Sequence, residues 1–447
     1  MYWANFLHVY QPPGQTHSIL ERIVTESYEK IITGLFNHPK VKLTLNINAG
    51  LTETLAASRH QEIIEKIRKL LERGQIELTG TAKYHPLLPK MPPSEIERQI
   101  QINEITNREY FGPAYQPKGF FPPEMAYNAK VGKIVQKLDF QWIILDETAI
   151  KQPIDYSKTY QNSSGLGFFF RERQTSFKIL SAQLGTANLF LKNLGERLEK
   201  NDYLLTAMDG ETFGHHRPGL EQLLWDIGEK PKLPTVRISD LLKLYPENIM
   251  VEPQPTSWAM VDPILAEKIP FIRWDDPDNE IQQKQWEFAG LAITAVEKDG
   301  RPKSRNLLDK ALYSDQFWWA SARPWWSLEM IEKGAHSLLK AVQSCDNIEE
   351  RIKQQAKELY LGIIITSFDW QRSGKVEKMS RKEDEEIKTR TTISSSSLSE
   401  KDYLEMIKNL TLQMLTSAKS QEYTRAQQIK ERIKEIKERK LDTKVNQ

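Results

Sequence analysis

The chain has 447 residues, which is enough to bury a large core and suggests about two or three domains. Its 62 basic and 60 acidic residues leave a formal net charge of +2, so the charge gives no reason to expect nucleic acid or a membrane surface as a partner. Cys345 is the only cysteine, which excludes an intrachain disulfide and a thiolate metal cluster. No secretory signal pattern or membrane-spanning apolar run is present, so we expect a cytoplasmic protein.

The first 270 residues alternate between strand and helix patterns. "VKLTLNI" (Val41–Ile47) has apolar residues at every second position, and "QEIIEKIRKLLERG" (Gln61–Gly74) has a helical apolar face that ends at a glycine. Ser94 and Glu97 form a capping-box pattern at the start of a further helix. More short strands are predicted at "IEL" (Ile76–Leu78), "KGFF" (Lys118–Phe121), "WIILDE" (Trp142–Glu147), "FKIL" (Phe177–Leu180) and "YLLTAM" (Tyr203–Met208). This alternation predicts a parallel sheet, open or closed into a barrel, over residues 1–270.

The pattern changes after residue 270. Long segments with helical periodicity, such as "LEMIEKGAHSLLKAVQ", predict a helical domain over residues 271–375. Residues 376–399 are charged and then rich in serine and threonine, which predicts a flexible linker. Residues 400–447 have two stretches of helical apolar spacing with a break near Ser420, which predicts a helical hairpin.

Polar residues gather where the predicted strands end. In "LLTAMDGETFGHH" (residues 204–216) an apolar strand runs directly into Asp209, Glu211 and a pair of histidines. Because polar side chains are costly to bury without partners, we expect them at the carboxyl end of the strand, where barrel enzymes place their chemistry. Four other segments stand out in the same way: "HVYQPP" with His8, "GQIELTGTAKYHPLLP" with Glu77, "GFFPPEMAYN" with Glu124, and "SDQFWWASARPWW" with Asp315 beside four tryptophans.

Each of these residues also has a structural explanation. A histidine at a strand end usually satisfies backbone groups, a strand glutamate can pair with a lysine, and a glutamate after two prolines can favour a helix N-terminus. A parallel barrel would nevertheless gather His8, Glu124 and Asp209 at one mouth. Cleavage of a glycosidic bond needs two carboxyl groups in different protonation states, which burial or nearby like charges produce. Glu124 and Asp209 are the natural pair, with Glu77 and Glu211 as surrounding negative charge.

The tryptophans are unevenly distributed along the chain. Six of the 11 lie between residues 258 and 325, namely Trp258, Trp274, Trp286, Trp318, Trp319 and Trp325. Their faces are suited to stacking on sugar rings, although tryptophans more often fill cores.

In this order, the five polar segments resemble the five sequence regions of glycoside hydrolase family 57, and they are most similar to its amylase-like branch. The resemblance runs from His8 to about Trp319 and more loosely to Lys375. It implies an α/β fold with an incomplete (β/α)7 barrel, followed by a helical domain that completes the active-site cleft. It also implies an enzyme that acts on α-glucans or malto-oligosaccharides with retention of configuration, and that needs no metal and no cofactor.

The same resemblance assigns residue roles. It places the nucleophile on Glu124 and the general acid/base on Asp209. It implies substrate contacts at His8, Gln11, Glu77, Glu211, His216, Trp258, Trp274, Asp315 and Trp318. One departure is Tyr10, because other members carry a second histidine in the first region.

Alternative functions stay open at this point. A 4-α-glucanotransferase or a branching enzyme of the same family would use the same carboxyl groups. A metal-dependent carbohydrate deacetylase would use Asp209, His215 and His216 as ligands, although adjacent histidines in an extended segment point in opposite directions. A non-catalytic glucan-binding protein would keep the sugar site without its chemistry.

The C-terminal segment resembles a second known element. "YLEMIKNLTLQMLTSAKSQEYTRAQQIKERIKEIKE" is similar to the UVR motif, a small helical hairpin that mediates protein contacts, and this implies a protein partner. A solvated helical tail or a self-association element would give the same pattern.

Overall fold

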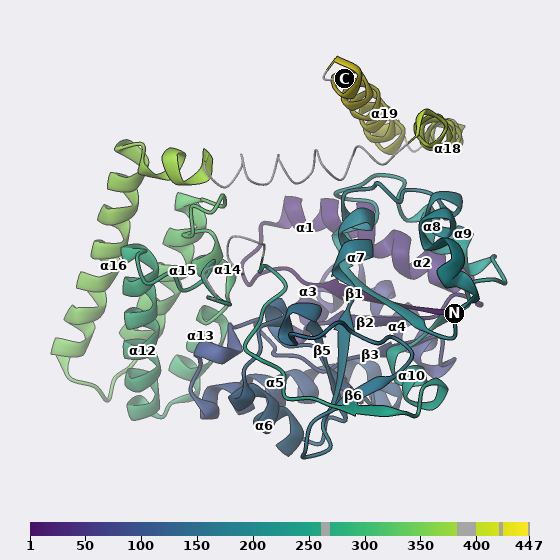
Figure 1. Ribbon diagram of the computed structural model, residues 1–447. Coiled ribbons are helices and arrows are strands. Elements are labelled where there is room, and N and C mark those ends of the chain that lie inside the picture. Colours follow the sequence, from purple (N-terminus) through teal and green to yellow (C-terminus); the bar gives the residue numbers. More distant parts are fainter. Residues whose placement is uncertain (261–268, 382–398, 420–422, 446–447) are drawn as a thin grey trace.

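The structure is a computed structural model that describes residues 1–260, 269–381, 399–419 and 423–445 (Figure 1). Two sheets form the centre of the N-terminal part. In the first, parallel strands lie in the order β3 (Ile76–Leu78), β2 (Leu43–Ile47), β1 (Tyr2–Val9) and β8 (Tyr203–Asp209), and β9 (Thr235–Val236) pairs with the start of β1. The second has the order β10 (Asn248–Met250), β6 (Thr159–Gln161), β7 (Gly167–Arg171), β5 (Trp142–Asp146) and β4 (Gly119–Phe120), in which only β6 and β7 pair antiparallel.

The two sheets join into an incomplete barrel. A parallel bridge between Gly80 and Phe120 connects the end of β3 to β4. On the other side, the amide of Glu172 donates to the carbonyl of Leu205 at 2.7 Å, between the ends of β7 and β8. The ring therefore runs through β1, β2, β3, β4, β5, β7 and β8, which confirms the expected incomplete (β/α)7 barrel. Strands β2, β5 and β7 are buried along their whole length, as expected for parallel strands that helices cover.

Helices surround this barrel. They are α1 (His17–Ile23), α2 (Glu29–Asn37), α3 (Ala49–Ala56), α4 (Gln61–Glu72), α5 (Pro93–Phe111), α6 (Ala129–Lys137), α7 (Arg173–Leu180), α8 (Ala187–Leu194), α9 (Gln222–Gly228) and α10 (Ile238–Leu244). A five-residue π-helical segment, Val24–Tyr28, lies between α1 and α2.

Two local predictions were wrong. "FKIL" is not a strand, because these residues end α7, which begins after Glu172 caps the amide of Thr175. Ser94 does not cap α5, because the helix begins at Pro93, whose fixed φ suits the first helical turn.

The helical region that follows packs directly against the barrel. It comprises α12 (Glu280–Asp299), α13 (Pro302–Ala311), α14 (Asp315–Trp318), α15 (Leu328–Gln343) and α16 (Glu350–Arg372). Side chains of α5 and α6 share one hydrophobic cluster with α12, α13 and α15. Two ion pairs cross the same boundary: Arg98 with Asp309 at 2.7 Å, and Arg305 with Glu95 at 2.6 Å. This contact fixes α14, and with it Asp315, against the barrel.

The C-terminal part has two described helices, α18 (Glu400–Lys419) and α19 (Tyr423–Val445), which pack through Leu410, Ile429 and Ile433. The predicted linker begins inside a helix, because residues 375–381 are helical and Val376 is buried in the large core; residues 382–398 lie outside the described part. No described helix is long and apolar enough to cross a membrane.

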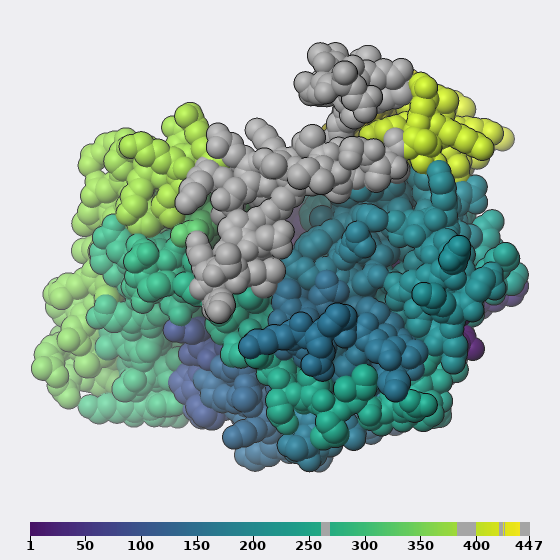
Figure 2. Space-filling view, viewed as in Figure 1, coloured from purple at the N-terminus to yellow at the C-terminus, as the bar shows by residue number. Residues whose placement is uncertain are grey.

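The helical hairpin rests on the barrel rather than standing free (Figures 1 and 2). Asp402 pairs with Lys192 of α8 at 2.8 Å, and Arg425 pairs with Glu221. The amide of Gln428 donates to Glu26 at 2.5 Å, in the segment before α2. The hairpin therefore covers the barrel surface beside the chain that follows Asp209.

Candidate active site

The carboxyl ends of the barrel strands bring distant residues together. His8 near the end of β1 lies opposite Asp209 at the end of β8 in the strand register. Glu124 follows β4 in the short helix Pro123–Met125, and Glu211 follows β8 in Gly210–Thr212. Asp315 begins α14 and reaches the same mouth, where it accepts a hydrogen bond from Tyr10 at 2.6 Å.

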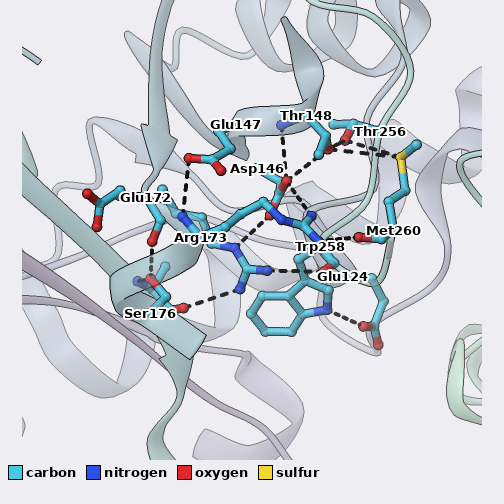
Figure 3. A network of polar contacts seen from close by, with 12 residues as sticks. Glu124, Asp146, Glu147, Thr148, Glu172, Arg173, Ser176, Thr256, Trp258 and Met260 are labelled. Atoms are coloured by element: carbon cyan, nitrogen blue, oxygen red, sulfur yellow. Dashed lines mark hydrogen bonds and ion pairs between the residues drawn. The ribbon is translucent and has the colours of Figure 1, made fainter. Parts of the chain in front are cut away.

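Glu124 is held in an unusual backbone conformation. Its φ of 62° lies in the left-handed region, which is uncommon for a residue with a Cβ and tends to occur at functional sites. The indole of Trp258 donates to Oε2 of Glu124 at 2.8 Å (Figure 3), and the hydroxyl of Ser314 donates to Oε1 at 3.4 Å. Burial, with the charges of Asp315 and Asp209, raises the pKa of Glu124 to about 8.

Asp209 responds to the same surroundings. Burial and the charge of Asp315 raise its pKa to about 6, against the opposing effect of the nearby Arg171 guanidinium. The structure therefore gives Glu124 a higher proton affinity than Asp209, which is the reverse of the order that a charged nucleophile and a neutral acid need. Arg171 contributes to this order because it lowers the pKa of Asp209, whereas burial and the charge of Asp315 raise the pKa of Glu124.

Glu211 is held by two neutral donors. The hydroxyl of Tyr28 donates to Oε1, and the amide of Gln11 donates to the same oxygen at 2.8 Å. Burial and the charge of Asp209 raise the pKa of Glu211. Gln11 and Glu211, both expected at the substrate site, are thus in direct contact.

A stack of three aromatic rings forms one wall of the mouth. The ring of Tyr10 lies 3.9 Å from that of His85, and the ring of His85 lies 5.1 Å from that of His8. Asn46 fixes the His8 ring by a 2.7 Å contact to Nδ1, and burial lowers the pKa of His8 to about 4, so that it is neutral at neutral pH. Within the described residues, Nε2 of His8 and Nε2 of His85 are buried without a hydrogen-bond partner, as expected of atoms that bind a ligand.

Other expected substrate residues do not join this group. Glu77 accepts hydrogen bonds from Thr44 at 2.8 Å and from the backbone of Ser239 at 2.9 Å, so it supports the sheet and the start of α10. Trp274 is fully buried in the core that the barrel shares with the helical region. His216 is exposed to solvent.

The remaining two tryptophans differ in position. Trp258 lies at the mouth, where its indole N–H donates to Glu124. Trp318 is half-buried between the rings of Trp274 and Trp325, at 5.0 and 5.9 Å, with Arg273 over its face. Its contacts are with the helical region.

The ligand set of the deacetylase alternative is not assembled. Nδ1 of His215 contacts Glu26 at 2.5 Å, so this ring is engaged by the segment before α2. Across the residues that the structure describes, no group of three histidine, cysteine or acidic side chains is placed to hold a metal ion.

Several functional candidates were missed in the sequence. Tyr28 lies 183 positions from its partner Glu211, and nothing in its local pattern marks it. Arg171 and Ser314 are also missing from the prediction. His85 belongs to the segment "YHPLLP" (residues 84–89). A histidine that follows a strand and precedes a proline could have indicated this residue as a candidate.

Comparison with known proteins bears on this arrangement. The sequence model of glycosyl hydrolase family 57 matches residues 4–226, about half of the chain. The chain is 24% identical over 230 residues to alpha-amylase 1 of Dictyoglomus thermophilum, which covers 52% of this chain and 31% of the relative. The chain thus spans about a third of the length of the curated relatives it matches.

Solved structures share the fold. The 4-alpha-glucanotransferase from Thermococcus litoralis has a TM-score of 0.63 at 16% identity, covering 77% of this chain and 58% of that one. The family 57 type branching enzyme from Pyrococcus horikoshii has a TM-score of 0.62 at 16% identity, covering 82% of this chain and 96% of that one. The sequence match and the shared barrel agree, and the chain belongs to glycosyl hydrolase family 57.

Proposed function

We propose that this protein is a retaining, α-glucan-active glycoside hydrolase of the amylase type, with Glu124 as nucleophile and Asp209 as general acid/base. The observation that carries the proposal is that these two carboxyl groups, 85 positions apart in sequence, are half-buried at one barrel mouth, where burial and the charges of Asp315 and Asp209 raise the pKa of Glu124. Retaining cleavage needs such a pair.

The reaction proceeds as a double displacement. A carboxylate oxygen of Glu124 bonds to the anomeric carbon as the glycosidic bond breaks, and the departing oxygen takes the proton of Asp209. Asp209 then removes a proton from water, whose oxygen displaces Glu124 from the sugar. With a sugar hydroxyl in place of water, the same steps give transfer.

The proton order has a consequence for this mechanism. With a pKa of about 8 for Glu124 and about 6 for Asp209, the unbound site at neutral pH carries its proton mainly on Glu124. The positive charge that develops on the sugar in the transition state favours ionised Glu124 and sends the proton to Asp209. A pKa near the working pH also suits Asp209, which must donate a proton in one step and accept one in the next.

Sugar hydroxyls have partners at the mouth. The free Nε2 atoms of His8 and His85 and the carboxyl groups of Asp315 and Glu211 offer hydrogen bonds at fixed positions. A neutral imidazole can donate or accept, which suits a hydroxyl. This set supports a sugar in the subsite next to Glu124.

Trapping of the covalent intermediate tests the roles directly. The protein is incubated with a fluorinated maltosyl fluoride that slows release, and its peptides are examined by mass spectrometry. We expect the label on Glu124 and none in E124Q, which should lose turnover by several decades and still bind maltoheptaose. E104Q is the matched control, because burial also raises the pKa of Glu104, to about 7, while its contacts are with Tyr115 and Asn103.

The outcomes separate the alternatives. A label on Asp209 reverses the two roles. Turnover that persists in E124Q removes the proposal, and binding without turnover in the wild type leaves a glucan-binding protein. Release of acetate from an acetylated sugar, lost on chelation and restored by a divalent metal, would favour the deacetylase.

Hydrolysis and transfer are separated by products. The related proteins include an alpha-amylase, a 4-alpha-glucanotransferase and a branching enzyme, so the acceptor is the point of difference. Maltoheptaose is incubated with the protein and the products are resolved by chromatography. A gain in reducing ends indicates hydrolysis, whereas a redistributed ladder of chain lengths indicates a transferase.

We also propose that the hairpin, as a UVR-like element, makes protein contacts. On α18, Leu404, Leu412 and Leu415 are 55%, 66% and 58% exposed, while the opposite side packs on α19. Exposed leucines on one helix are typical of a protein contact. Sedimentation velocity of the full chain over a range of concentrations tests the alternative of self-association, which replacement of the three leucines by serine should abolish. A monomer at all concentrations would contradict self-association.

A further inference from the structure

Arg171 is a buried cation in the barrel wall. It is the last residue of β7 and is 3% exposed. Its Nε donates to Asp146, the last residue of β5 and its partner in the strand register, at 2.7 Å. Arg173 donates to the other oxygen of Asp146 at 2.8 Å (Figure 3). The Asp146 carboxylate thus holds two arginines.

The two terminal nitrogens of Arg171 reach beyond this pair. Nη2 donates to the carbonyl of Trp258 at 3.0 Å, and the guanidinium carbon lies 5.6 Å from the centre of the Trp258 ring. Trp258 in turn donates its indole N–H to Glu124 at 2.8 Å and its backbone N–H to the Glu124 carbonyl at 3.0 Å. Arg171 is therefore in direct contact with Trp258, the residue that orients Glu124.

The second terminal nitrogen points to the other catalytic strand. Nη1 donates at 3.3 Å to the carbonyl of Ala207, two residues before Asp209 on β8. Few backbone contacts join β7 and β8 here, because their only described ladder-like bond is from Glu172 to Leu205. Arg171 therefore adds a side-chain link between the end of β7 and the end of β8.

We propose that Arg171 is a positioning residue for both catalytic carboxyl groups: one guanidinium fixes Trp258, which orients Glu124, and also the strand end that carries Asp209. The inference rests on the proposed function for the roles of the two acids. A planar guanidinium is suited to this task, because its fork of donors can hold several acceptors at fixed angles.

Besides its hydrogen bond to the strand that carries Asp209, Arg171 acts on Asp209 through its charge. The groups that face Asp209 are Glu124, Glu211 and Asp315, together with Tyr28 from the π-helical segment and Arg171 from β7. The three carboxyl groups favour a protonated Asp209, and Arg171 opposes them. Without Arg171 the pKa of Asp209 should rise.

The test compares R171M, R171K and R197M. Arg197 is the matched control, because it binds two carboxylates, Glu172 and Asp202, and the carbonyl of Tyr203 at the other end of β8. We expect R171M to lower kcat for maltoheptaose about 100-fold, as misplacement of reacting groups does, with a smaller change in KM. R197M should lose stability with little change in kcat per folded molecule.

R171K keeps the positive charge and loses the fork. It should lower kcat, since a lysine cannot hold Trp258 and Asp146 together, while the acid limb of the pH profile stays in place. In R171M that limb should move to higher pH. If either variant has the kcat and the pH profile of the wild type, the proposal is overturned. If R171M fails to fold, the kcat of R171K alone tests the positioning role.

A second readout does not depend on activity. D209N is compared with the same protein that keeps Asp209, and the difference in melting temperature is measured as a function of pH. This difference reports the pH at which Asp209 ionises in the folded chain. In the R171M background, or in R171Q if that chain does not fold, the difference should level off at a higher pH than in the wild type. An unchanged curve would contradict the inference that Arg171 lowers the pKa of Asp209. If the wild-type protein does not turn over glucan at all, only the proposed function is contradicted.

Discussion

Two carboxyl groups of the barrel, Asp146 at the end of β5 and Glu124 after β4, behave in opposite ways. Asp146 accepts hydrogen bonds from two arginines and from Thr148, and this lowers its pKa. At the mouth, Glu124 accepts from Trp258 and Ser314, and burial raises its pKa to about 8. Here the carboxylate that is paired with cations has a lowered pKa, whereas the carboxyl group that is held by neutral donors has a raised pKa.

The difference also predicts an effect on stability. Asp146 should stabilise the fold because its charge is compensated, while the mouth carboxylates should destabilise it at neutral pH because theirs are not. The site thus keeps proton affinities near neutral pH at the expense of stability, and the following predictions address that contrast.

The largest effect is expected for Asp209→Asn. Removal of the acid/base should lower maltoheptaose hydrolysis about 10³-fold, since the leaving oxygen must take a proton. With α-maltosyl fluoride as substrate the first step should fall far less, because fluoride leaves without protonation. Burst kinetics measure both steps, and an equal loss on the two substrates would show that Asp209 does not protonate the leaving group.

Asp146→Asn should give the largest loss of stability. It leaves Arg171 and Arg173 buried without their counter-ion, so the free energy of unfolding in urea should fall by about 3 kcal/mol at pH 7. Because the pKa of Asp146 is lowered in the fold, the difference from the wild type should shrink as the pH falls towards acid values. A neutral result would mean that the arginines find other partners.

Glu124→Gln should change stability in the other direction. The unfolded chain ionises this carboxyl near pH 4.5 and the folded chain only at about 8, so the wild type loses stability relative to E124Q as the pH rises through that window. We expect E124Q to be more stable by about 1–3 kcal/mol at pH 9 and equal at pH 4. E104Q provides a comparison outside the mouth, and a less stable E124Q at pH 9 would contradict the contrast.

The activity should depend on pH in a bell shape. Between about pH 6 and 8 the pair of Asp209 and Glu124 holds one proton, which is the state that the reaction needs. Below pH 6 both groups are neutral and above pH 8 both are charged, so kcat/KM should fall about tenfold for each further unit. An initial-rate profile from pH 4 to 10 measures this, and a rate that stays constant to pH 10 would exclude the shared proton.

The strands that were predicted correctly are those with strong local patterns. Trp142–Asp146 and Tyr203–Asp209, which are β5 and β8, are mostly apolar runs that end in an aspartate, and the short Ile76–Leu78, which is β3, alternates apolar and polar residues. "FKIL" failed because a four-residue apolar run fits a helix as well as a strand. The preceding "GFFFR", which is β7 and carries Arg171, was overlooked.

The site was predictable only in part for the same reason. Asp209 and Glu211 stand close in sequence after one strand, so their proximity follows from the chain itself. Tyr28 and Ser314 reach the carboxyl groups through tertiary packing, which leaves no trace in local periodicity. The contacts of the Glu77 carboxylate with Thr44 and with the start of α10 also depend on the closed sheet, so local patterns do not reveal them.

The smallest effect is expected where this chain departs from the family pattern, at Tyr10. Tyr10→Phe keeps the ring against His85 and removes the hydroxyl that donates to Asp315 at 2.6 Å. Because that bond lowers the pKa of Asp315, its loss should leave less of the carboxylate ionised to bind a sugar hydroxyl.

KM for maltoheptaose should therefore rise about 3- to 10-fold in Y10F, with kcat nearly constant, as the loss of one hydrogen bond predicts. Y10H offers a ring N–H as donor in place of the hydroxyl, and it should recover part of the binding. Steady-state kinetics of the three proteins at pH 7 measure this. A fall in kcat as large as that of D209N would instead place the Tyr10 hydroxyl in the chemical step. In that case a neutral donor at the mouth would transfer a proton as well as hold a carboxyl group.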